Sequence, residues 1–173
     1  MTFRNEYPHL VKFLVMSALS FFVGAFHGML QVLPPIRAWL DAIGSPYGGP
    51  GHMIDPLAHA HINLVGGVVL LAMGTTYYLL PIFSGRSIYS IRLINYSLWW
   101  TAIGQFYFYI TQVVFGIWEG NLLLEDPSKI ESAHHYYGPI VAGAGITMAM
   151  GFFFFLLNVL LSLRMGNKLP TGS

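Results

Sequence analysis

Four long runs without Asp, Glu, Lys or Arg constrain the fold of this chain more than any other feature. These charge-free runs cover residues 13–33, 58–83, 93–118 and 132–163. An unpaired charge in the core of a bilayer costs about 3 kcal/mol, and a helix needs roughly 20 apolar residues to cross it. Each run is long enough to cross, so the sequence predicts four transmembrane helices.

The composition agrees with a membrane protein. Only 9% of the residues are charged and 55% are hydrophobic, whereas an average soluble domain has roughly 25% charged residues. We therefore predict a single all-α membrane domain over residues 1–173, built as a four-helix transmembrane bundle embedded in the lipid bilayer. Its spans are expected at about residues 12–33, 58–83, 93–118 and 136–163.

Other classes of protein are excluded by the charge and by the cysteine content. A net charge of +1 is too small for binding to a nucleic-acid backbone, so no nucleic-acid partner is expected. The chain has no cysteine. This excludes disulfides, thiolate metal sites and a haem tethered through cysteine.

The charges at the ends of the runs predict the orientation. Six of the eight basic residues lie beside the N-terminus, the second loop or the C-terminus: Arg4, Lys12, Arg86, Arg92, Arg164 and Lys168. Six of the seven acidic residues lie at the opposite ends: Asp41, Asp55, Glu119, Glu125, Asp126 and Glu131. Basic residues stay in the cytoplasm. Both termini should therefore be cytoplasmic, in a multi-pass protein of the inner (cytoplasmic) membrane.

The connection between the first two spans is rich in Gly and Pro. Pro34, Pro35 and the Gly/Pro run over residues 44–56 predict one long loop on the outer side. Loops of this size without structure of their own are usually functional. We expect this loop to be functional or to cover a ligand.

Five of the seven histidines are expected at similar depth on three helices. His27 lies in the outer third of the first span, His59 and His61 begin the second, and His134 and His135 begin the fourth. A neutral imidazole binds iron, and two imidazoles from facing helices can clamp a haem. Two other interpretations stay open: one of the pair at 134 and 135 belongs to an interfacial aromatic belt, or His27 only bonds a neighbouring helix.

Glycines follow the histidines along the second span. Gly66, Gly67 and Gly74 lie seven, eight and fifteen residues after His59, which places them near one helix face at 3.6 residues per turn. A stripe without side chains admits another helix or a flat ring. Small-residue packing is frequent in membranes, while the nearby histidines favour Gly67 and Gly74 as part of a haem face.

The second span resembles the tenth transmembrane helix of subunit I of the haem–copper oxidases. The run AHAHINLVGGVVLLAMGTTYYLLPIFSG matches that helix in its Ala-His-x-His start, its glycines and its Pro-x-Phe-Ser-Gly end. The third span resembles the eleventh helix of the family. The shared residues there are Ile103, Gly104, Gln112 and Gly116. The first and fourth spans would then correspond to the ninth and twelfth helices.

The resemblance implies a role for each histidine of the motif. His61 matches the ligand of the low-spin haem, which transfers electrons. His59 matches the proximal ligand of the high-spin haem, where oxygen or nitric oxide is reduced. Two positions on a helix are about 200° apart, so the pair would hold two haems on opposite faces.

This sequence also departs from the family. The helix with the second low-spin haem ligand and the helix with a copper-ligating His four residues before Tyr are both absent from it. The pair His134 and His135 resembles the copper-binding pair of the family, but here it follows the His-x-His helix instead of preceding it. No copper role is transferred, and copper stays an option without support. A complete oxygen-reducing site within this chain is not expected, and no catalytic residue is assigned.

Three functions follow. The first is a small b-type cytochrome of a respiratory chain, with one or two haem b groups and electron transfer between a quinol and a soluble cytochrome. Its iron ligands would be His59 or His61 together with His134, His135 or His27. The second is an oxidoreductase part of a terminal oxidase or nitric oxide reductase, completed by other membrane subunits or by a homo-oligomer. The third is a haem-free structural subunit.

Overall fold

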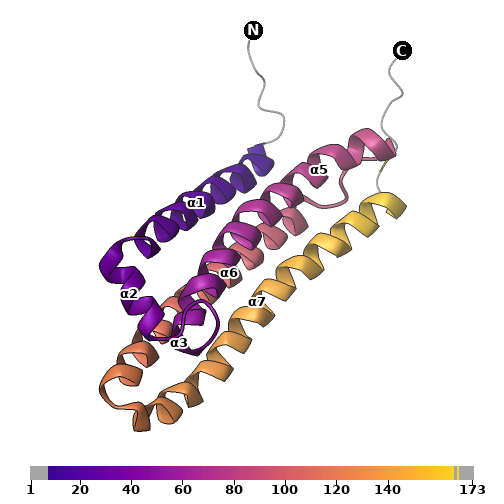
Figure 1. The fold of residues 1–173 in the computed structure, drawn as a ribbon. Helices are drawn as coiled ribbons and strands as arrows, with labels where there is room; N and C mark the ends of the chain where they lie inside the picture. Colours follow the sequence, from indigo (N-terminus) through magenta and orange to yellow (C-terminus); the bar gives the residue numbers. More distant parts are fainter. Residues whose placement is uncertain (1–7, 166, 168–173) are drawn as a thin grey trace.

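The computed structural model describes residues 8–165 and residue 167, and these residues are almost entirely helical (Figure 1). No strand is found in that part of the chain. The all-α architecture is therefore confirmed. The segments labelled η1 and η2 are π-helical, and η3 is a single 3-10 turn. In chain order the elements are α1 (Pro8–Gln31), α2 (Pro34–Ala42), α3 (Gly49–His52), η1 (Met53–Ala58), α4 (His59–His61), η2 (Ile62–Val69), α5 (Leu70–Ser84), α6 (Ile91–Glu125), η3 (Pro127–Lys129) and α7 (Ile130–Met165).

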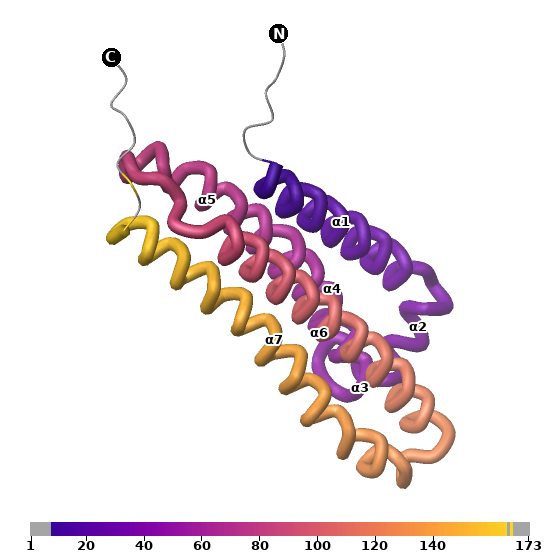
Figure 2. The backbone as a smooth tube through the Cα atoms, turned by 180° about the vertical axis from the view of Figure 1, so that it is seen from behind, coloured from indigo at the N-terminus to yellow at the C-terminus, as the bar shows by residue number. Residues whose placement is uncertain are grey.

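The long helical segments of the chain run lengthwise beside one another (Figures 1 and 2). They are α1, the segment from α3 to α5, α6, and α7. Three of them are long and apolar enough to cross a membrane, namely Pro8–Gln31, Gly49–Ser84 and Pro127–Met165. Helix α6 is 35 residues long but more polar. The structure thus supports a multi-pass membrane protein, and the crossing by α6 stays a prediction.

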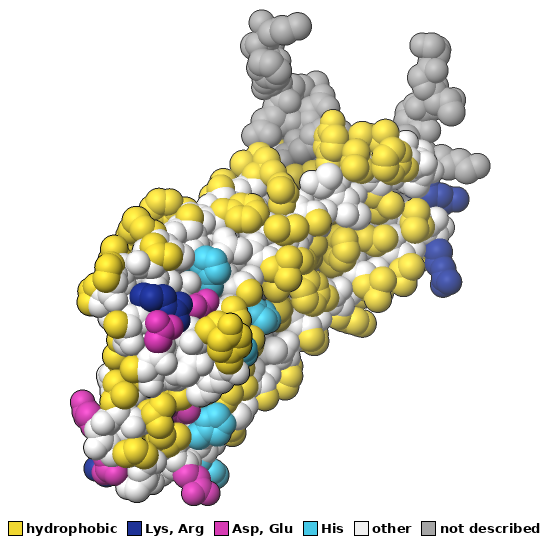
Figure 3. Space-filling model, viewed as in Figure 1, with side chains coloured by type: hydrophobic (Ala, Val, Ile, Leu, Met, Phe, Trp, Pro, Cys, Tyr) yellow, Lys and Arg dark blue, Asp and Glu magenta, His cyan; other side chains and the backbone are white. Residues whose placement is uncertain are grey.

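The interior of the bundle lies between α1, α5 and α6. Its buried side chains are Leu10, Phe13, Leu70, Met73, Tyr77, Ile94, Leu98 and Ala102. Large apolar side chains cover most of the visible length of the outer surface (Figure 3). A bundle that is apolar on the outside as well as in its core is suited to lipid, because lipid solvates such a surface at no cost.

Helices α6 and α7 approach each other closely at glycines. A methyl group on Gly104 would lie 2.8 Å from Cα of Met148, and one on Gly151 would lie 2.9 Å from Cα of Thr101. Real side-chain carbons do not come so near to backbone atoms. The two glycines therefore set the distance between these helices, as small residues do in membrane proteins.

The connection predicted as one long loop contains the two short helices α2 and α3. Pro34 and Pro35 open α2, where a missing N–H costs nothing. Leu40 and Ile43 then pack with Ile54 in a second small core. Asp55 interrupts the helical path with φ −132° and ψ 110°, an extended conformation that a following proline favours. From Pro56 the chain is helical up to Ser84.

The two ends of the bundle differ in charge. The start of α1 and the end of α7 lie at one end, and α2, α3 and the turn between α6 and α7 lie at the other (Figure 1). Acidic side chains gather at this second end (Figure 3). Arg4 and Lys168, used above for the orientation, lie outside the described residues. The cytoplasmic placement of the termini stays a prediction.

Candidate functional site

The two histidines of the His-x-His motif face different helices. Both lie on α4, three and five residues after Pro56. The ring of His59 faces α1, where a methyl group on Gly28 would come within 2.8 Å of its Cε1 atom. The ring of His61 faces α6 and lies 4.3 Å from the Phe108 ring, centroid to centroid. The two rings therefore point to different helices, as the spacing predicts.

His61 has the hydrogen bond that an iron ligand needs. Its Nδ1 atom lies 3.0 Å from the carbonyl oxygen of Leu57 one turn earlier. A carbonyl only accepts, so Nδ1 carries the proton and Nε2 keeps its lone pair. Histidines that bind metals almost always have their other nitrogen held in this way. His61 is also only partly buried, so its ring is accessible to a haem.

His59 is held less well. Its Nδ1 atom is buried and has no hydrogen-bond partner among the described residues. Its Nε2 atom lies 3.5 Å from the Asn63 amide nitrogen, which also donates to the His59 carbonyl at 2.9 Å. No carbonyl or carboxylate fixes the ring. As an iron ligand, His59 fits the geometry less well than His61.

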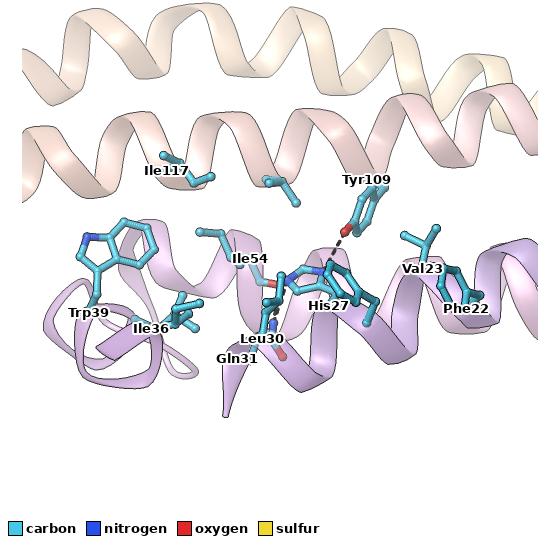
Figure 4. Close-up of a pocket in the computed structure, with 13 residues that line it drawn as sticks. Phe22, Val23, His27, Leu30, Gln31, Ile36, Trp39, Ile54, Tyr109 and Ile117 are labelled. Carbon is cyan, nitrogen blue, oxygen red and sulfur yellow. Dashed lines mark hydrogen bonds between the residues drawn. The ribbon is translucent and has the colours of Figure 1, made fainter. Parts of the chain in front are cut away.

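His27 is engaged at both ring nitrogens (Figure 4). The Gln31 amide nitrogen lies 3.0 Å from Nε2 of His27 and 3.3 Å from the carbonyl of Ile54. An amide nitrogen donates, so Nε2 accepts and Nδ1 carries the proton. Nδ1 then donates to the Tyr109 hydroxyl at 3.1 Å. The structure thus favours the interpretation in which His27 bonds a neighbouring helix, here α6 through Tyr109, and it leaves no lone pair on His27 for iron.

His134 and His135 lie far from the other histidines. His134 is 3.1 Å from both carboxylate oxygens of Glu119, and His135 is exposed beside Tyr136. Glu119 is eleven positions after Phe108, which corresponds to about 16 Å along α6. The expected single layer of five histidines is therefore wrong. Helices α6 and α7 extend beyond the level of α4 and carry this pair outward.

The glycine stripe lies against a helix. A methyl group on Gly67 would meet the ring of Phe21, and one on Gly74 would lie 2.8 Å from Cβ of Phe13. Phe13 and Phe21 both belong to α1. The structure thus places α1 over this face, and the contact is of the small-residue kind frequent between membrane helices.

Several polar residues that contact the histidines were not predicted from the sequence. Glu119 directly follows the charge-free run 93–118, yet it is only 2% exposed and sits on α6. Its spacing of three and seven residues from Gly116 and Gln112 places all three on one helix face, and this signal was available in the sequence. Gln31 and Asn63 each lie four residues after the histidine that they contact, so helix spacing marks them in the same way. Nothing in the sequence marks Tyr109 as a partner of His27.

In the described part of the chain, no group of side chains could hold a metal ion without a cofactor. No three side chains of the His, Asp or Glu type converge there. A haem needs less from the protein, because the porphyrin supplies four ligands and the chain supplies only an axial one. His61 meets that requirement.

Comparison with known proteins gives a consistent relationship. Residues 56–139, which contain the His-x-His helix and α6, match the family described as Cytochrome C and Quinol oxidase polypeptide I. The chain is 26% identical to "Cbb3-type cytochrome c oxidase subunit CcoN1" of Stutzerimonas stutzeri, over 64% of this chain and 22% of that protein. It is 24% identical to "Cytochrome c oxidase subunit 1 homolog, bacteroid" of Bradyrhizobium diazoefficiens, over 82% of this chain and 27% of that protein.

The chain spans about a quarter of the length of the curated relatives that it matches. The matched residues include His59, His61 and the whole of α6. These matches confirm the resemblance seen in the sequence: the chain has the helices of a multi-pass membrane protein, and it resembles part of subunit I of the haem–copper oxidases.

Proposed function

We propose that this chain is a haem-carrying membrane subunit that transfers electrons in a respiratory chain, with His61 as an axial ligand of a b-type haem. The single observation that carries the proposal is the hydrogen bond from Nδ1 of His61 to the Leu57 carbonyl. It fixes the ring and leaves Nε2 as the free base. A haem bound there would accept and donate one electron at a time.

The second axial ligand is proposed to come from another chain. Within this chain His27 has no free nitrogen. His134 contacts α6 at Glu119, roughly 16 Å along the helix from Phe108, which His61 contacts. The missing ligand matches the departure from the family noted above. A partner subunit, or a second copy of this chain, would complete the site.

The environment of His61 suits electron transfer. Phe108 covers one side of the imidazole, and an apolar neighbour restricts the access of water to a bound group. With two imidazole ligands the iron has no open position, and such a centre transfers electrons without binding oxygen. We propose a quinol as the electron donor and a soluble cytochrome, docked on the acidic side, as the electron acceptor. The chain would cross the inner membrane four times, with both termini in the cytoplasm.

The second candidate is a part of a terminal oxidase or nitric oxide reductase with a high-spin haem at His59. The observation that favours it is the placement of His59 on the face of α4 that points to α1, away from His61. A separate haem on that face would need partner subunits to supply the remaining residues of a reducing centre.

A visible spectrum of the complex tests both candidates. The tagged chain is purified from its own membranes with whatever subunits accompany it, then reduced with dithionite and exposed to carbon monoxide. A b-type band that carbon monoxide does not move supports the electron-transfer role. A band that carbon monoxide shifts supports the high-spin candidate. If haem is absent from protein made with adequate haem supply, both proposals are wrong and the structural role remains.

A further inference from the structure

A cavity of about 320 Å³ opens between α1, α2 and α6, beside His27 (Figure 4). Its walls are apolar, with Phe26, Leu40 and Val113 among the lining residues. Gln31, His27 and Tyr109 contribute polar atoms. Phe22 and Phe26, at its edge, are 70% and 52% exposed. The cavity is therefore accessible from the apolar outer surface of the bundle.

The hydroxyl of Tyr109 has a proton without an acceptor. Because Nδ1 of His27 donates to this oxygen, the Tyr109 hydrogen points elsewhere. The described residues offer it no other partner. A donor that lines an apolar cavity is costly to leave unpaired, and an acceptor on a bound ligand would satisfy it.

The position of Tyr109 restricts the ligand. The residue lies nine positions inside the charge-free run 93–118, which is about 13 Å from the nearer end of that run. A charged or strongly hydrated molecule would not reach this depth. A hydrocarbon chain would reach it but has no use for a hydrogen-bond donor. The remaining class is a lipid-soluble ring with a carbonyl oxygen.

We propose that this cavity binds the headgroup of a lipid-soluble quinone, whose carbonyl oxygen accepts the hydrogen bond from Tyr109. His27 and Gln31 act as positioning residues, since they turn the hydroxyl toward the cavity. The site deepens the proposed function and rests on it for its physiological meaning, because it supplies the place where a quinol donor would bind.

Binding is measured in nanodiscs with decyl-ubiquinone as the probe. Trp39 lines the cavity, so saturable quenching of its fluorescence reports occupancy, and Trp39→Phe identifies that part of the signal. Tyr109→Phe removes the donor and keeps the ring. We expect the half-saturation concentration to rise about fivefold to tenfold, as for a lost neutral hydrogen bond. The matched control is Tyr107→Phe, on the neighbouring surface of α6 outside this cavity, with no change expected.

Three results would overturn the quinone site. One is the absence of saturable quenching. Another is equal affinity of Tyr109→Phe and the unaltered protein. The third is competition by decylbenzene, which lacks carbonyl groups, at the same concentrations as the quinone; that would make the cavity a site for lipid chains. The readout does not depend on haem. A protein without a haem band that still binds quinone through Tyr109 would overturn the proposed function alone.

Discussion

Both carboxylate oxygens of Glu119 lie 3.1 Å from Nδ1 of His134, and this contact joins the outer ends of α6 and α7. The Glu119 side chain is buried, whereas that of His134 is about half exposed. His134 is the only side chain that bonds the Glu119 carboxylate in the described part of the chain. A buried carboxylate is costly without a partner.

Removing His134 should therefore destabilise the bundle. We expect His134→Ala to lower the free energy of unfolding by about 1–3 kcal/mol, since Glu119 stays buried and loses its donor. The measurement is thermal unfolding in detergent, followed by circular dichroism. His135→Ala, at the exposed neighbouring histidine, is the control and should leave the midpoint unchanged. Equal midpoints for both variants would contradict the role of the pair.

Two glycines of α7 should respond in opposite ways to the same substitution. Gly151→Ala places a methyl group against the backbone of Thr101, and we expect a loss of about 1–3 kcal/mol. Gly145 has no neighbour within 4 Å of an added methyl group, so Gly145→Ala should gain up to about 1 kcal/mol from helix propensity. Both values come from the same unfolding experiment. A gain for Gly151→Ala would show that α6 and α7 are not in close contact there.

Arg37 connects α2 to Asp55, the residue that interrupts the helical path before the His-x-His helix. It donates to Asp55 at 2.8 Å and to Ser45 at 2.9 Å, and it also pairs with Asp41. These hydrogen bonds to Asp41 and Asp55 raise the pKa of Arg37 above its ordinary value, so the guanidinium stays charged at all working pH values.

Arg37→Lys should cost about 1–3 kcal/mol of stability, because a single ammonium cannot replace a planar group that bonds three side chains. The matched control is Lys129→Ala, which removes an exposed ion pair with Asp126 and should leave the stability almost unchanged. Chemical unfolding in detergent compares the two. An Arg37→Lys protein as stable as the unaltered one would show that the network does not brace α2.

Sequence patterns predicted where the helices lie better than they predicted which side chains contact one another. The charge-free runs coincide with long helical segments, three of which are apolar enough to cross a membrane, because the cost of a charge in lipid is a local property of the sequence. The Gly and Pro content of residues 34–56 concealed α2 and α3, since Pro34 and Pro35 occupy the first turn of a helix, where they are tolerated. Whether α6 crosses the membrane is left to experiment.

The site was only partly predictable for a related reason. The opposite faces of His59 and His61 follow from helix geometry alone. The separation of His134 from His61 depends on how far α6 and α7 extend beyond α4, and neither hydropathy nor spacing sets that length. Gln31 lies one helical turn from His27 on α1, whereas Tyr109 belongs to α6, so the Tyr109 contact emerges only once the two helices pack.

The central claim is that His61 binds haem iron. The most direct test purifies the tagged chain with its accompanying subunits, as the unaltered protein, His61→Ala and His59→Ala, and compares the dithionite-reduced spectra. We predict a b-type band that His61→Ala abolishes and His59→Ala retains. A band of unchanged intensity in His61→Ala would contradict the account.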